Sequence, residues 1–154
     1  DFDVAEWQSR LRGVDVVINA VGILRQSRTQ TFQALHTRAP HALFQACAAA
    51  RVRRVVQISA LGAQSGESEY FRSKRAADDA LRELPLDWTV VRPALVYGPG
   101  GASARLFTTL AALPIIPVPG RGDQPLQPIH IDDLVDVDYD EDGIVNNRDS
   151  TPEG

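Results

Sequence analysis

Tyr70 and Lys74 are the residues whose types and spacing best suit proton transfer. They are four positions apart at the start of a predicted helix, so their side chains share one helix face. A free phenol ionises near pH ~10, too high for a base at neutral pH. A lysine ammonium roughly 6 Å away, at an effective dielectric of 20, favours the phenolate by about 3 kcal/mol, which lowers the phenol's pKa by about 2. The pair is therefore predicted to exchange a proton with a carbonyl or a hydroxyl.

Ser59 lies at the end of the strand predicted before this helix. Residues 55–58 form a short apolar, β-branched run typical of a buried strand, and Ser59 follows directly. Its hydroxyl is predicted to hold the substrate oxygen while the proton moves. The alternative is a surface tyrosine and a solvated lysine that share a helix face by chance. Lys74 is the only lysine in the chain, so its place four residues after a tyrosine favours the catalytic interpretation.

Alternating strands and helices are predicted to position these residues. The pattern indicates an α/β fold, a doubly wound parallel sheet of Rossmann-like type. In such sheets ligands bind outside the carboxyl ends of the strands. The turn Ala20-Val21-Gly22 after the strand 14–19 would let a ligand approach the backbone, although an ordinary strand-to-helix turn is the alternative. The predicted helices are 4–12, 29–51 with a kink or restart at Pro40, 68–84 and 103–112, and the other strands are 54–59 and 88–92.

Ser59, the Tyr70-x-x-x-Lys74 pair and the segment RPALVYGPG at 92–100 resemble the short-chain dehydrogenase/reductase superfamily. The resemblance is greatest to its extended and atypical branch: NAD-dependent epimerase/dehydratase-like proteins and relatives of the complex I subunit that retains this fold. It covers residues 1–134, a partial NAD(P)-binding domain. It implies NAD or NADP as cofactor, hydride transfer to or from a small-molecule substrate, Tyr70 as general acid/base, Lys74 as the residue that holds the ribose, and Ser59 as the residue that orients the substrate oxygen.

The resemblance also implies a cofactor-binding set. Asp1 would be the remnant of an acidic residue placed against adenine, and the residues after Arg92 would pack against the nicotinamide. His36 falls where many family members carry an active-site asparagine, so it is interpreted either as a catalytic proton relay or as a polar structural contact. The full predicted set is Asp1, Asn19, Ala20, Val21, Gly22, Ser59, Tyr70, Lys74, Arg92, Pro93, Ala94 and Val96.

The chain departs from the family in lacking the Gly-rich turn that binds pyrophosphate at a helix N-terminus. We therefore expect an N-terminally incomplete, truncated domain that binds NAD or NADP weakly or not at all. Its strand 14–19 would form an exposed edge that favours homodimerisation or aggregation. Two alternatives to an oxidoreductase or sugar-nucleotide epimerase-like enzyme stay open: a non-catalytic nucleotide-sensing or assembly protein, and an inactive fragment.

The acidic tail, residues 135–154, carries a second pattern. Counted from Asp138, acids fall at positions one, three, five and twelve, and glycine falls at six, the arithmetic of an EF-hand-type calcium loop. The stretch resembles dockerin and thrombospondin type 3 loops. A solvated acidic tail is the alternative. The predicted calcium ligands are Asp138, Asp140, Asp142, the Ile144 carbonyl and Asp149.

Composition restricts partners and location. A net charge of −4 gives no electrostatic reason to expect nucleic acid as a partner. No apolar run approaches the ~18 residues of a membrane span, and no signal peptide is recognisable, so we expect a cytoplasmic protein. The single cysteine, Cys47, lies in an alanine-rich run and is predicted to be a small core residue.

Overall fold

A computed structural model describes residues 3–101, 105, 108–110, 112 and 127–135 of the chain. The chain divides into two compact units, one that contains the residues up to Arg92 and one that contains Pro93–Val145. Each unit is described by itself.

The first unit contains a three-stranded parallel sheet. Its strands are β1 (Val16–Asn19), β2 (Arg54–Ile58) and β3 (Asp87–Val91), in the order β1-β2-β3. Helical connections separate them, which confirms the predicted α/β alternation. The helical segments are α1 (Val4–Arg10), η1 (Gln33–Arg38), α2 (Ala39–Ala50) and α3 (Glu69–Arg82).

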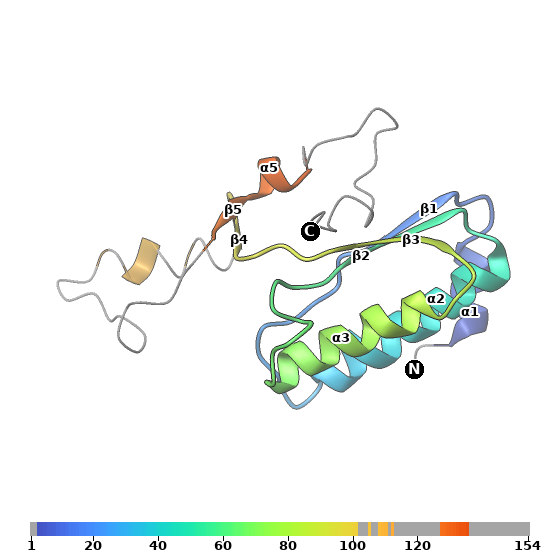
Figure 1. Ribbon diagram of the computed structural model, residues 1–154, viewed down its shortest axis with the longest axis horizontal. Coiled ribbons are helices and arrows are strands. Elements are labelled where there is room, and N and C mark those ends of the chain that lie inside the picture. The colour runs from blue at the N-terminus through green and yellow to red at the C-terminus, as the bar shows by residue number, and fades with distance from the viewer. Residues whose placement is uncertain (1–2, 102–104, 106–107, 111, 113–126, 136–154) are drawn as a thin grey trace, which may run out of the picture. The chain divides into compact units, whose positions relative to one another are not determined.

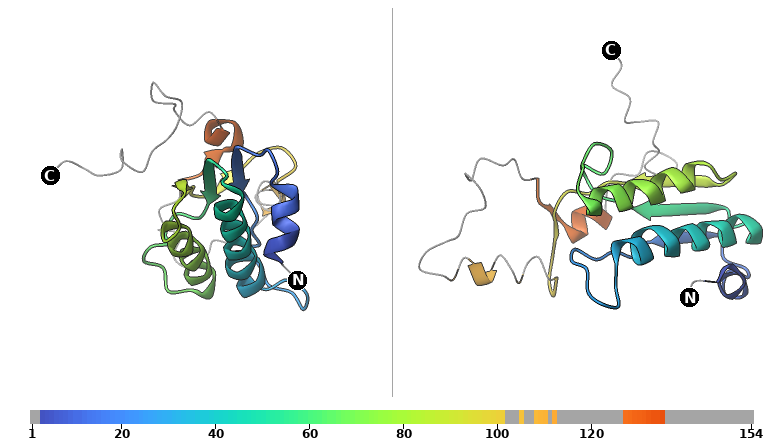
Figure 2. Two further views of the ribbon diagram at one scale, coloured as in Figure 1. Left: turned by 90° about the vertical axis from the view of Figure 1, so that its right-hand side faces the viewer. Right: turned by 90° about the horizontal axis from the view of Figure 1, so that it is seen from below.

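One helical layer covers this sheet. Figures 1 and 2 show α2 and α3 side by side beneath the strands, with α1 against α2. Both crossovers are β-helix-β connections between neighbouring parallel strands, so the same handedness places α2 and α3 on the same face. Among the described residues of this unit, helices lie on that face alone.

The core fills the space between the sheet and these helices. Along β2, Val55 and Gln57 are buried while their neighbours are partly exposed, which is the alternation expected of a strand with one covered face. Cys47 is fully buried, as predicted, and burial raises the pKa of its thiol to about 11. The buried core residues are Leu11, Leu43, Phe44, Ala46, Cys47, Val52, Val55, Ala77 and Leu81.

The predicted helix 29–51 contains a change of helical type at the expected place. Residues Gln33–Arg38 form a π-helix, in which the Ala39 N–H donates to the carbonyl of Ala34 five residues earlier. The α-helix restarts at Ala39 with Pro40 in its first turn, where the missing N–H of proline is tolerated. The helix runs through Pro40 without interruption, so the predicted kink or restart takes the form of a change of helical type just before this proline.

The next helix, α3, begins at a side-chain cap. Ser68 accepts a hydrogen bond from the Phe71 N–H at 3.3 Å, and Glu69 adds an acidic residue to the positive end of the helix. The buried residues of α3 include Lys74, Ala77, Asp78 and Leu81, the helical spacing of one face. This cap and this face fix the direction of every functional side chain on α3.

Strand β1 forms an edge of the sheet, because within the described part of the chain it pairs with β2 alone. Ile18 is 65% exposed and Val16 is also exposed, as predicted for this edge. The same expectation was wrong for Val14 and Val17, which pack against the core. Val17 faces inward because successive strand residues point to opposite faces. Homodimerisation through this edge stays a prediction.

The second unit contains a short parallel pair, β4 (Val96–Tyr97) and β5 (Ile129–His130), followed by the helix α5 (Ile131–Val135). Half of the helix predicted at 103–112 falls outside the described residues. None of the helices that the structure describes is long and apolar enough to cross a membrane.

Candidate functional site

The predicted functional residues of the first unit gather where β1 and β2 end. The turn after β1 (residues 20–24), the residues after Ile58 and the first half of α3 meet there. Lys74 connects all three: its Nζ donates to the carbonyl of Ile58 at 3.2 Å and to that of Val21 at 3.4 Å. The side chain is buried, and this burial lowers the lysine pKa although the charge of Asp78 opposes the change. A cation therefore sits directly beneath the carboxyl edge of the sheet.

Gly22 is the residue of the turn at which a side chain would meet Lys74. A Cβ added at Gly22 would lie 3.1 Å from Lys74 Nζ and 3.6 Å from His36 Nε2. An alanine at this position would require the ammonium to shift by a few tenths of an ångström. The requirement for a small residue at this turn thus comes from a side chain of the same chain.

The Tyr70 ring is fixed by other rings. It makes edge-on contacts with Phe32, His36 and Phe71 at centroid distances of 5.7, 5.4 and 5.3 Å. The side chain is half-buried, and its hydroxyl makes no hydrogen bond to any residue that the structure describes. Burial raises the tyrosine pKa, so the expectation that Lys74 lowers it was wrong. The Lys74 ammonium is turned toward backbone carbonyls, where it does little to offset the loss of hydration around the phenol.

His36 is buried between the turn and α3, with 1% of its surface exposed. Its Nε2 accepts the Ile23 N–H at 2.9 Å, and its Nδ1 lies 3.0 Å from Ser73 Oγ. The Ser73 hydroxyl in turn donates to the Tyr70 carbonyl at 2.7 Å. Burial, followed by the charge of Lys74, lowers the histidine pKa to about 4. Both ring nitrogens are engaged, which favours the structural interpretation of His36 over the proton relay.

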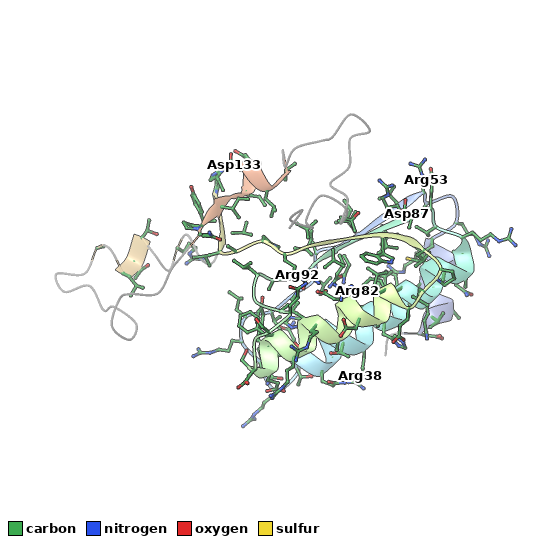
Figure 3. The ribbon with its side chains drawn as sticks, in the orientation of Figure 1. Arg38, Arg53, Arg82, Asp87, Arg92 and Asp133 are labelled. Atoms are coloured by element: carbon green, nitrogen blue, oxygen red, sulfur yellow. The ribbon has the colours of Figure 1, made fainter. Side chains whose placement is uncertain are left out.

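Ser59 is held by a buried ion pair that the sequence interpretation missed. Its hydroxyl donates to Asp78 Oδ2 at 2.9 Å, and Arg92 donates to the same oxygen from Nε at 3.2 Å and from Nη2 at 3.0 Å. Arg92 lies between the end of β3 and α3 (Figure 3). Burial raises the pKa of Asp78, while Ser59 and Arg92 act against this change. The sequence did carry a signal that Asp78 belongs to the site, because Asp78 lies four residues after Lys74 on the same helix face.

Asn19 supports the turn from below. Its amide donates to Gln57 Oε1 at 2.7 Å, its oxygen accepts the Val21 N–H at 3.4 Å, and both side chains are buried. Residues 20–22 themselves are exposed, so the backbone above Asn19 is accessible.

The other predicted residues lie elsewhere. Pro93, Ala94 and Val96 belong to the second unit. Asp1 lies outside the described residues, as do all five predicted calcium ligands: Asp138, Asp140, Asp142, Ile144 and Asp149. Within the described ranges no three His, Cys, Asp or Glu residues form a potential metal site.

Similar proteins of known sequence include two long relatives. Ceramide reductase of Caulobacter vibrioides is 29% identical over 123 residues, 79% of this chain and 38% of that protein. The mitochondrial 40 kDa subunit of NADH-ubiquinone oxidoreductase from Neurospora crassa is 27% identical over 138 residues, 87% of this chain and 36% of that subunit. The chain therefore spans less than two fifths of the length of these relatives.

Solved structures share the fold. MoeE5 in complex with UDP-glucose and NAD superposes with a TM-score of 0.72 at 24% identity, over 86% of this chain and 54% of that one. UDP-glucuronic acid 4-epimerase from Bacillus cereus, in complex with UDP-glucuronic acid and NAD, gives 0.68 at 18% identity, over 86% and 51%. These likenesses confirm the Rossmann-like fold. Because its residues 1–109 match the family described as NAD(P)H-binding, the chain belongs to that family.

Proposed function

We propose that this chain carries the proton-transfer residues of an NAD(P)-dependent oxidoreductase or epimerase-like protein with a small-molecule substrate. One observation carries the proposal: a Tyr70 hydroxyl that makes no hydrogen bond to any described residue, one helical turn from a buried Lys74, at the carboxyl edge of a parallel sheet. That edge is where α/β sheets bind their ligands.

The residues at this edge fit a nicotinamide dinucleotide. Lys74 has three N–H donors, and the described carbonyls of Val21 and Ile58 accept from two of them, which leaves one for a ribose hydroxyl. The exposed backbone of residues 20–22 offers further polar groups. Bound nicotinamide would supply or accept a hydride.

The raised pKa of Tyr70 indicates the direction in which this residue works best. At neutral pH its phenol keeps the proton, so Tyr70 acts as a general acid that protonates a carbonyl oxygen. Ser59 donates its own proton to Asp78, so its oxygen is left to accept a hydrogen bond from the product hydroxyl that forms when the carbonyl oxygen takes the Tyr70 proton. Reduction of a carbonyl is the reaction that this protonation pattern favours.

The proposal is tested by titration of NADH and NADPH, followed by turnover of a panel of carbonyl compounds. Binding is expected to be weak, because the sequence has no Gly-rich phosphate turn. Tyr70→Phe should retain cofactor binding and lose about 10²-fold or more in turnover. Lys74→Met should lose both binding and turnover. The control is Arg72→Met, an exposed residue of the same helix.

Two results separate the alternatives. Cofactor binding without turnover of any carbonyl compound would favour a nucleotide-sensing or assembly protein. Unchanged binding in Lys74→Met, or full turnover in Tyr70→Phe, would contradict the assignment of these residues.

A further inference from the structure

We propose that His36 is a positioning residue, a neutral imidazole with its proton on Nδ1, that ties the turn after β1 to the backbone of Tyr70. Its effect on the reaction rests on the proposed function of Tyr70 and Lys74. Its effect on the turn does not, because the contacts that carry it lie within the chain itself.

The donors and acceptors around His36 allow one tautomer. A backbone N–H can only donate, so His36 Nε2, which faces the Ile23 N–H at 2.9 Å, carries no proton. The proton of the neutral ring is therefore on Nδ1, where it donates to Ser73 Oγ at 3.0 Å. Ser73 accepts this bond, and its own hydroxyl donates a hydrogen bond to the Tyr70 carbonyl at 2.7 Å. Each donor in this chain of hydrogen bonds has one acceptor.

Two parallel connections fix the turn to α3. His36 holds the Ile23 N–H, and Lys74 holds the Val21 carbonyl at 3.4 Å. The His36 ring also stacks on Phe32 at a centroid distance of 5.1 Å and meets Tyr70 edge-on. The turn, the ammonium and the phenol are consequently held as one assembly with His36 at its centre.

The helical segment that carries His36 is itself unusual. His36 lies within the π-helical turn Gln33–Arg38. Such turns are rare and occur frequently at functional sites.

Protonation of His36 would break this arrangement, because a proton on Nε2 would face the Ile23 N–H. Lys74 and Tyr70, both on α3, are the titratable groups that face the ring, and residues 20–24 and Phe32 carry none. Burial and the positive charge of Lys74 both disfavour the imidazolium. The neutral tautomer therefore persists at neutral pH.

Nuclear magnetic resonance on the 154-residue chain tests this without any cofactor. Long-range ¹H–¹⁵N correlation should show a protonated Nδ1 and an unprotonated Nε2. Amide exchange at Ile23 should rise about tenfold in His36→Asn, whose side chain is too short to reach Ile23; that factor equals about 1.4 kcal/mol. His36→Gln, whose side-chain oxygen reaches as far as Nε2, should restore most of the protection. His41→Gln, at an exposed histidine, is the matched control.

Exchange of the Gln57 amide in β2 is the control for general unfolding. It should stay unchanged in His36→Asn if this substitution releases only the turn. In the active protein, Ser73→Ala should lower kcat more than it raises KM, because it interrupts the connection to Tyr70 and leaves Lys74 in place. A proton on Nε2, or unchanged Ile23 exchange in His36→Asn, overturns the inference. The Nδ1 tautomer and a protected Ile23 amide support the inference whether or not the chain binds NAD(P)H. Full turnover in Tyr70→Phe would contradict only the proposed function.

Discussion

Removal of Arg92 should destabilise the first unit more than neutralisation of its partner Asp78, because the two ends of this ion pair are unequally buried. The Asp78 side chain is 1% exposed and that of Arg92 is 17% exposed. Arg92→Met leaves a carboxylate in the interior with the Ser59 hydroxyl as its remaining donor, and loss of one partner of a buried pair costs about 3–5 kcal/mol. In Asp78→Asn the guanidinium keeps some contact with water, so the expected cost is about 1–3 kcal/mol.

Urea denaturation followed by circular dichroism measures both losses by linear extrapolation. The matched control is the neighbouring pair Arg82–Asp79 on α3, whose side chains are 32% and 56% exposed. Arg82 is also labelled in Figure 3. Asp79→Asn should cost less than about 1 kcal/mol, because this carboxylate is exposed and hydrated and its ion pair gains little.

The pH dependence provides a second check with a defined sign. Burial already raises the pKa of Asp78 above its usual value, and removal of Arg92 should raise it further. The folded variant then binds a proton more readily than the unfolded chain, so its stability relative to the parent should recover as pH falls from 7 toward about 5. Equal losses for Arg92→Met and Asp78→Asn at pH 7, or a deficit that does not change with pH, would refute this reasoning.

Three further expectations concern the turn, acid stability and the tail. Gly22→Ala should weaken NADPH binding in a fluorescence titration, because the new methyl group would lie 3.1 Å from Lys74 Nζ, and unchanged affinity would contradict this. Since the His36 pKa is lowered from 6.5 to about 4, stability should fall by up to about 3 kcal/mol as pH drops through that interval, and His36→Gln should flatten the slope measured by urea denaturation. If the tail binds calcium, the amide resonances of Gly143 and Val145 should shift at roughly 10⁻⁴ to 10⁻³ M, whereas no shift up to ~10 mM identifies a merely acidic segment.

The local pattern of the sequence was sufficient to predict the strands and helices of the first unit and the part of the site that lies on α3. Alternation and β-branched runs predicted β2, and helical spacing placed Tyr70 and Lys74 on one face of α3. The alanine-rich run predicted a buried Cys47, and Pro40 indicated the place where the helical type changes before α2. These features depend on neighbours within a few positions, which is the range over which periodicity and capping act.

Only the tertiary structure decided what each functional side chain contacts. The partners that matter are far apart in the chain: Lys74 with Val21, His36 with Ser73, and Arg92 with Asp78. Periodicity states which face of an element is buried, and it does not state which polar groups meet in that interior. The direction of a pKa change depends on those groups, because loss of hydration and nearby charges compete at each site. For this reason the pairing of Tyr70 with Lys74 could be predicted from their spacing, whereas the raised pKa of Tyr70 and the role of Asp78 became evident only from packing.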